Sequence, residues 1–135
     1  MRIVIASDHG GYELKEDLGR RLVETGHQVE DLGTGGMESV DYPDYAIAAA
    51  ERVSAGDADF GIVICKTGIG VSVAANKVKG IRAGLCVTLR MAEMSRRHNN
   101  ANILAIGAMN QTPDEAWRMT EVFLSTPFEG DRHAR

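Results

Sequence analysis

Cysteine, proline and aromatic residues are all scarce in this chain of 135 residues, which has 2 cysteines, 3 prolines and 5% aromatic residues. Cys65 and Cys86 form neither a CxxC pair nor a disulfide framework, which fits a reducing compartment. No hydrophobic run reaches membrane-spanning length, and the run from Met1 to Ala6 is too short for the apolar region of a signal peptide. We therefore expect a cytoplasmic protein with no membrane partner.

Positive charge and cofactor motifs are also in short supply. The net charge of -4 and the pI near 5.5 disfavour a nucleic-acid-binding surface. The 4 histidines are widely separated and show no metal-ligand spacing. Gly68-Ile69-Gly70 lacks the third glycine of a dinucleotide fingerprint, and Lys66-Thr67 does not make a P-loop. We expect a small ligand, with no cofactor, no metal and no nucleic-acid partner.

Strand-like and helix-like segments alternate along the whole sequence. The first helix carries Leu14, Leu18 and Leu22 as one apolar stripe, and Thr112 to Glu115 opens the last helix with a capping box. The strand-like segments are residues 2–6, 28–32, 81–86 and 103–107, with a further one that contains Ile62 to Ile64 and ends at Cys65. The other helices are expected from Pro43, over 72–78 and over 90–97. This alternation predicts an α/β three-layer sandwich with a five-stranded parallel Rossmann-like sheet. We expect a single domain over 1–135, with 127–135 as a C-terminal tail.

The most informative segment runs from Asp59 to Ser72 and delivers Cys65 directly into a glycine-bearing turn. The apolar run before Cys65 suits a strand buried on both faces, while Gly68 and Gly70 allow a tight turn that exposes backbone N–H groups. Such a turn before a helix receives anions and favours a thiolate at its rim. An inert buried thiol is the alternative, but the adjoining loop favours chemistry. Cys86 has no such loop and is assigned to the core.

Other polar residues are predicted at the same end of the sheet, where ligands bind in open parallel sheets. Asp8 and His9 follow the first strand, and Asp41 and Tyr42 follow the second. Each has a structural alternative, because Asp8 could simply cap a helix and Tyr42 could simply pack before Pro43.

A second polar group ends the fourth helix. His98 and Asn99 could form a polar helix C-cap, and Arg96, Arg97 and the tail arginines would ordinarily be solvated charges. The sequence alone does not place this group beside the cysteine, because that requires tertiary or quaternary folding.

Several short motifs occur in order along nearly the whole chain. They are Ser7-Asp8-His9-Gly10-Gly11, Val40-Asp41-Tyr42-Pro43, Cys65-Lys66-Thr67-Gly68-Ile69-Gly70, Ala74-Ala75-Asn76-Lys77, Gly80-Ile81-Arg82-Ala83, Ser95-Arg96-Arg97-His98-Asn99-Asn100-Ala101-Asn102 and Gly130-Asp131-Arg132-His133. Together they closely resemble the type B ribose-5-phosphate isomerase family, which is related to the galactose-6-phosphate isomerase subunits.

The resemblance implies aldose–ketose isomerisation of a sugar phosphate through an enediolate, without metal or cofactor. In this family pattern Cys65 moves the proton between adjacent sugar carbons, and Thr67 helps to transfer a hydroxyl proton. The backbone of Gly68, Ile69, Gly70 and Val71 would bind the enediolate oxygen.

The resemblance also assigns roles outside this loop. His98 assists ring opening with Asp8 orienting it or the sugar, Asn99 and Tyr42 hold oxygens, and His9 and Arg132 grip the phosphate. Family sites are assembled across a homodimer, so His98, Asn99 and Arg132 would serve the partner subunit's Cys65. A tetramer is also compatible with the resemblance.

Three positions qualify the resemblance. Lys66 stands where the family usually has glycine, and it is a possible specificity residue. The second phosphate-binding arginine, expected four residues after Arg132, lies beyond the last residue, so either Arg135 substitutes or the chain is cut short. Val71 stands where some relatives place a glutamate base, which favours Cys65 as the base.

Ribose 5-phosphate is the first expected substrate. The alternatives are an isomerase of a tetrose or hexose phosphate, or a noncatalytic module that binds a sugar phosphate or a nucleotide.

Overall fold

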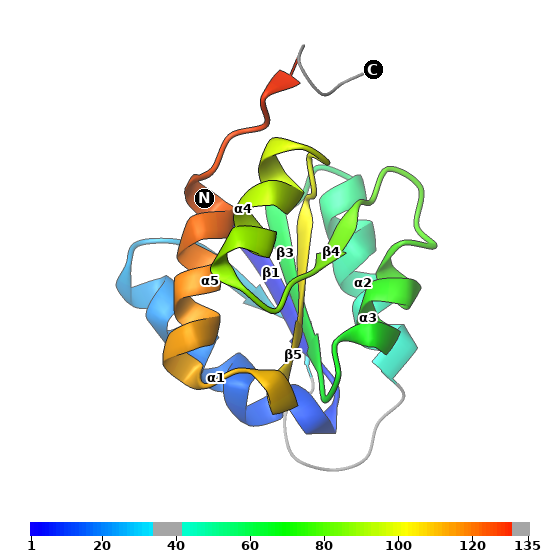
Figure 1. Cartoon of the computed structure of the whole chain (residues 1–135). Coiled ribbons are helices and arrows are strands. Elements are labelled where there is room, and N and C mark those ends of the chain that lie inside the picture. Colours follow the sequence, from blue (N-terminus) through cyan, green and yellow to red (C-terminus); the bar gives the residue numbers. More distant parts are fainter. Residues whose placement is uncertain (34–41, 131–135) are drawn as a thin grey trace.

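A twisted sheet of five parallel strands forms the centre of the protein (Figure 1). The computed structural model describes residues 1–33 and 42–130, the side chains of 42–44 excepted. The strands are β1 (Arg2–Ser7), β2 (Gln28–Asp31), β3 (Phe60–Cys65), β4 (Ala83–Leu85) and β5 (Ile103–Gly107), in the spatial order β2-β1-β3-β5-β4. The central strands β1, β3 and β5 are rich in isoleucine and valine and are buried on both faces, as covered parallel strands require.

Helices cover both faces of the sheet and make three layers. The α-helices are α1 (Tyr12–Glu24), α2 (Tyr42–Ser54), α3 (Ile69–Ala75), α4 (Leu89–Arg97) and α5 (Pro113–Ser125), with short 3₁₀ turns η1 (His9–Gly11) and η2 (Ala108–Asn110). One apolar core lies between the sheet and α1, α4 and α5, and the other lies under α2 and α3 (Figure 1). The predicted three-layer α/β sandwich with a five-stranded parallel sheet is confirmed.

Alternation along the strands decides which core each side chain joins. Ile62 and Ile64 of β3 enter the core under α1 and α5, whereas Val63 and Cys65 enter the core under α2 and α3. Each fully buried aliphatic side chain contributes roughly 1.5–3 kcal/mol, so this placement is strongly specified. Cys65 therefore leaves the sheet on the side of α3, the helix that its own loop begins.

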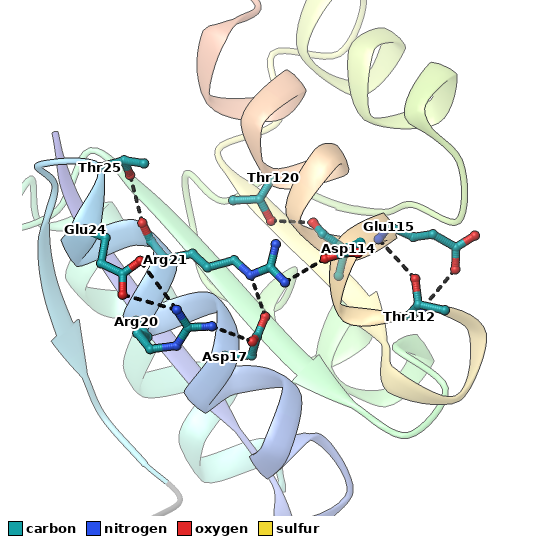
Figure 2. Close-up of polar contacts among 10 residues, drawn as sticks. Asp17, Arg20, Arg21, Glu24, Thr25, Thr112, Asp114, Glu115 and Thr120 are labelled. Atoms are coloured by element: carbon teal, nitrogen blue, oxygen red, sulfur yellow. Dashed lines mark hydrogen bonds and ion pairs between the residues drawn. The ribbon is translucent and has the colours of Figure 1, made fainter.

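Helix α5 starts at the capping box that the sequence predicts. The Thr112 hydroxyl accepts the N–H of Glu115 at 3.1 Å, and the Thr112 N–H donates to the Glu115 carboxylate at 2.8 Å (Figure 2). Arg21 of α1 reaches both Asp17 on its own helix, at 2.8 Å, and Asp114 on α5, at 2.7 Å. This guanidinium lowers the pKa of the Asp114 carboxyl and joins the two helices at the solvent edge.

Two elements differ from the sequence prediction by more than one residue at a boundary. Helix α3 begins at Ile69 rather than near Ser72, because Gly68 at its N-cap has a left-handed φ of 82° and turns the chain into the helix at once. Strand β4 is shorter than residues 81–86. The N–H of Ile81 donates to the Val78 carbonyl, and that of Arg82 to the Asn102 side chain, so neither joins the strand ladder.

Candidate active site

The carboxyl ends of β1 and β3 bring the first predicted residues together. The two strands are neighbours in parallel register, and the Asp8 N–H donates to the Ile64 carbonyl at 3.2 Å, one residue before Cys65. The Asp8 carboxylate accepts the N–H groups of Gly10 at 2.9 Å and Gly11 at 3.2 Å, so its expected capping role is observed. Asp8 is buried, and His9 stands exposed at the same edge.

The loop after Cys65 folds back onto the thiol. The Cys65 side chain is buried, and its Sγ accepts the N–H of Gly68 at 3.1 Å. The hydroxyl of Thr67 accepts the N–H of Ile69 at 3.2 Å and lies at the exposed surface. A backbone donor directed at sulfur stabilises negative charge there, which is what a catalytic base before proton transfer needs.

Close packing fixes the path of this loop. A Cβ on Gly68 would lie 2.5 Å from the Leu85 side chain and 2.8 Å from the backbone nitrogen of Gly107, and a Cβ on Gly107 would collide with the Thr67 carbonyl. The loop is thus wedged against the ends of β4 and β5, and only glycine fits at both positions. Of the other predicted loop residues, Ile69 is exposed, Gly70 is half-buried and Val71 is buried. Because the Val71 side chain points into the core, Val71 can contact a ligand only through its backbone.

Lys66 lies outside the core and faces a cavity. Its carbonyl accepts the N–H of Met109 at 3.0 Å, while its side chain lines a cavity of about 480 Å³ together with Gly10, Glu13 and Gln111. The cavity lies at the same edge of the sheet as Asp8 and Cys65. The side chain is exposed, and it is adjacent to the loop that bears the thiol.

His98 and Asn99 lie at the opposite edge of the sheet. His98 is the C-cap of α4, and the Asn99 carbonyl accepts from the Arg82 guanidinium at 3.1 Å, before β4 begins. Nearby, the Asn102 carbonyl accepts the N–H of Gly61 at the start of β3. Cys65 ends that strand four residues later, about 13 Å away at ~3.3 Å per residue. One chain therefore does not bring His98 to its own Cys65.

Four predicted positions cannot be placed fully. Tyr42 is the first residue of α2, but its side chain lies outside the described residues, as do Asp41, Arg132 and Arg135.

One buried charged residue, Lys15, was not identified by the sequence analysis. Lys15 is 1% exposed, and its ammonium donates to Asp31 at 2.5 Å and Glu16 at 2.8 Å. Burial alone would lower the lysine pKa, but hydrogen bonds and charge attraction from Asp31 and Glu16 raise it overall. Lys15 falls on the stripe of Leu18 and Leu22, at spacings of three and seven, and this spacing was the signal that could have revealed it.

The expectation that Arg96 is a solvated charge is wrong. Arg96 is 8% exposed and contacts the turn that follows His98 and Asn99. Its burial follows from its place four residues after the fully buried Ala92, on the face of α4 turned to the core. Arg97 does reach the surface, where it pairs with Glu129.

Over residues 1–33 and 42–130, no group of three or more histidine, cysteine, aspartate or glutamate side chains is arranged to hold a metal ion. In the same part of the chain, every helix is too short or too polar to cross a bilayer.

Comparison with known proteins places this site in a family. Residues 3–135 match the Ribose/Galactose Isomerase family. The ribose-5-phosphate isomerase B of Escherichia coli is 42% identical over 132 residues, which cover 98% of this chain and 89% of that protein. The solved ribose-5-phosphate isomerase B of Clostridium thermocellum superposes with a TM-score of 0.98 at 52% identity, over 99% of this chain and 90% of that one.

A further structural relative holds a sugar phosphate. The ribose-5-phosphate isomerase B of Mycoplasma genitalium, solved with bound ribulose-5-phosphate, has a TM-score of 0.93 and 42% identity, over 98% of this chain and 88% of that one. The fold and these matches define an enzyme of the aldose–ketose isomerase class. Within that class, the chain belongs to the Ribose/Galactose Isomerase family.

Proposed function

We propose that this enzyme interconverts ribose 5-phosphate and ribulose 5-phosphate through an enediolate, without a cofactor. The observation that carries the proposal is Cys65, which ends a buried strand with its sulfur 3.1 Å from the Gly68 nitrogen and with Asp8 directly after the neighbouring strand. The ribulose-5-phosphate bound to the Mycoplasma genitalium relative supports the choice of a five-carbon substrate.

In the proposed reaction the thiolate of Cys65 removes the proton from C2 of the open-chain aldose. The electron pair of the broken C–H bond forms the C1–C2 double bond, and the aldehyde oxygen becomes the enediolate oxygen. Return of the proton to C1 gives the ketose, while Thr67 moves a proton between the two oxygens. A positioned base of this kind typically contributes about 100- to 10,000-fold.

Backbone N–H groups of the Gly68–Val71 loop would stabilise the enediolate oxygen, chiefly those of Gly70 and Val71, because Gly68 donates to the Cys65 sulfur and Ile69 to the Thr67 hydroxyl. The glycine contacts described above hold this loop in place before substrate arrives, and a preorganised donor of this kind is worth on the order of 100- to 1,000-fold in other enzymes. Around it, we propose that Asp8 orients the sugar or His98, that His9 binds phosphate with Arg132 or Arg135, and that Tyr42 binds a sugar oxygen.

We propose that a homodimer assembles this site, with His98 and Asn99 supplied to the partner subunit's Cys65. The separation of these residues to opposite edges of one sheet supports sharing, since a second copy can bring the two edges together. Exposed apolar side chains also favour self-association. They include Ile69, Val73, Val87, Leu89, Met91 and Met109. A tetramer would be an assembly of such dimers.

The decisive experiment measures turnover of four-, five- and six-carbon aldose phosphates and their ketoses in parallel, with exchange of the C2 proton in heavy water. We expect the highest kcat/KM with ribose 5-phosphate. Preference for a tetrose or hexose phosphate would show that ribose 5-phosphate is not the substrate, and binding without C2 exchange would identify a noncatalytic module.

We also propose a single cytoplasmic domain, in keeping with two free cysteines.

A further inference from the structure

Arg96 is a buried cation held by neutral groups. Its Nη1 donates to the Ala101 carbonyl at 2.7 Å and the Asn100 side chain at 3.1 Å, and its Nε donates to the Thr126 carbonyl at 3.0 Å. The guanidinium also lies 4.8 Å from the ring centre of Phe60 and 5.9 Å from that of Phe123. No carboxylate ion pair with Arg96 occurs among the residues that the structure describes.

The three acceptors belong to two separate segments. Asn100 and Ala101 form the turn directly after His98 and Asn99, and Asn100 takes a left-handed φ of 50° there. Thr126 is the C-cap of α5 and begins the segment that leads toward Arg132. One planar side chain thus joins the turn behind His98 to the root of the C-terminal segment.

The next residue reinforces this connection. Arg97 donates to the Glu129 carboxylate at 2.9 Å, and the Glu129 N–H donates to the Arg97 carbonyl at 3.2 Å. The end of α4 and residues 126–129 are therefore fastened together at two successive positions. In Figure 1 both lie at the edge of the sheet opposite to η2 and the start of α3.

We propose that Arg96 is a positioning residue for the partner subunit's active site. The proposal rests on the shared site proposed above, in which His98 and Asn99 act on the partner's substrate. Because the guanidinium of Arg96 donates to both segments at once, it fixes the turn after His98 and Asn99 relative to the end of α5. Lysine cannot reproduce this, since an ammonium lacks the planar array of donors.

The first test is Arg96→Lys, with Arg118→Lys as the matched control. Arg118 is exposed on α5, about two helical turns before Thr126. A displacement of about 1 Å can cost a reaction on the order of 100-fold, so we expect kcat to fall about 10- to 100-fold in Arg96→Lys. We expect Arg118→Lys to keep wild-type kcat. Circular dichroism verifies that both variants are folded.

The second test uses hybrid dimers, purified with two affinity tags after co-expression of Arg96→Lys with Cys65→Ala. One site of the hybrid contains both defects, and the other contains neither, because Cys65 and Arg96 serve different sites. We expect about half the wild-type turnover per dimer, from the one intact site of a two-fold assembly. A purely structural loss in the Arg96 subunit would not be rescued in this way.

A hybrid of His98→Asn with Cys65→Ala provides the reference. If this reference hybrid recovers activity and the Arg96 hybrid stays as inactive as its parents, the positioning role of Arg96 in the partner's site is overturned alone. If neither hybrid recovers, the shared site and the Arg96 proposal fall together. If wild-type dimers show no isomerase turnover at all, the proposed function itself is wrong.

Discussion

The Sγ of Cys65 lies 3.1 Å from the backbone nitrogen of Gly68, so the thiol is hydrogen-bonded to the loop that follows it. The same loop would offer its remaining N–H groups to a substrate oxygen. In the proposed site, the base and the anion-stabilising group would thus come from one strand end and one tight turn, with few degrees of freedom between them. Small changes at Cys65 should therefore affect chemistry before they affect folding.

The two cysteines should respond very differently to substitution. We expect Cys65→Ala and Cys65→Ser to lose at least about 100-fold in kcat while still binding sugar phosphate, since a hydroxyl is a far weaker base than a thiolate. Cys86 lies in the core, where burial raises the pKa of its thiol. Cys86→Ala should keep its kcat, and a comparable loss of kcat in a folded Cys86→Ala protein would contradict this assignment.

Replacement of Gly68 should be far more harmful than replacement of Gly56, which also has a left-handed backbone conformation. Gly68 and Gly56 have φ values of 82° and 83°, but only Gly68 has neighbours in the space that a Cβ would occupy. We expect Gly56→Ala to cost about 1–2 kcal/mol with normal kcat, from backbone strain alone. Gly68→Ala should cost roughly 1–3 kcal/mol more and lower kcat at least tenfold. Urea unfolding and turnover measure both, and equal effects would exclude the packing argument.

The fold was predictable because its signals are local. Runs such as Ile62 to Ile64, the stripe of Leu14 and Leu18, and the capping box at Thr112 each depend on a few neighbouring residues. The bounds of the short strand β4 were predicted less well. The residues just before it bond to the side chain of Asn102, which lies 20 residues after Arg82 in a separate turn.

The candidate site was predictable in part. The strand order brings Asp8 and Cys65 to one edge, as expected for adjacent parallel strands, but it sends His98 to the other edge. Burial of Arg96 depends on Thr126 and on two aromatic rings from distant segments, which no local pattern reveals. Charge in a sequence predicts exposure only when no remote acceptors surround it.

His98 should matter more for one direction of the reaction. If it opens the sugar ring, His98→Asn slows turnover of the cyclic aldose phosphate more than that of the acyclic ketose, followed before ring closure limits release. We expect the ratio of forward to reverse kcat to fall by about tenfold or more, within the range for general acid–base groups. Equal losses in both directions would point to a role for His98 in the loop or the dimer.

The ion pairs of Lys15 with Asp31 and Glu16 should stabilise the protein over a defined pH range. The pKa of Lys15 is raised in the folded state, so the stabilising effect is complete below the unfolded value of 10.5 and is lost as pH rises through the folded pKa. Asp31 and Glu16 are half-exposed, which limits the effect, and we expect Lys15→Met to cost about 1 kcal/mol at pH 7. Denaturant unfolding should show this difference unchanged at pH 9 and smaller at pH 11. A difference that grows with pH would contradict the pairing.

Lys66 should influence the choice of substrate if its ammonium reaches the ligand. Its stem packs beside Gly10, and its side chain lines the cavity next to the Cys65 loop. Lys66→Met removes the charge but keeps much of the length, whereas Lys66→Gly also frees the backbone. If the charge acts, both variants change the ratios of kcat/KM among four-, five- and six-carbon sugar phosphates, and high salt reduces the wild-type preference. If only Lys66→Gly changes them, backbone freedom is responsible. Unchanged ratios in both variants would exclude Lys66 as a specificity residue and leave its ammonium as a solvated charge at the rim of the cavity.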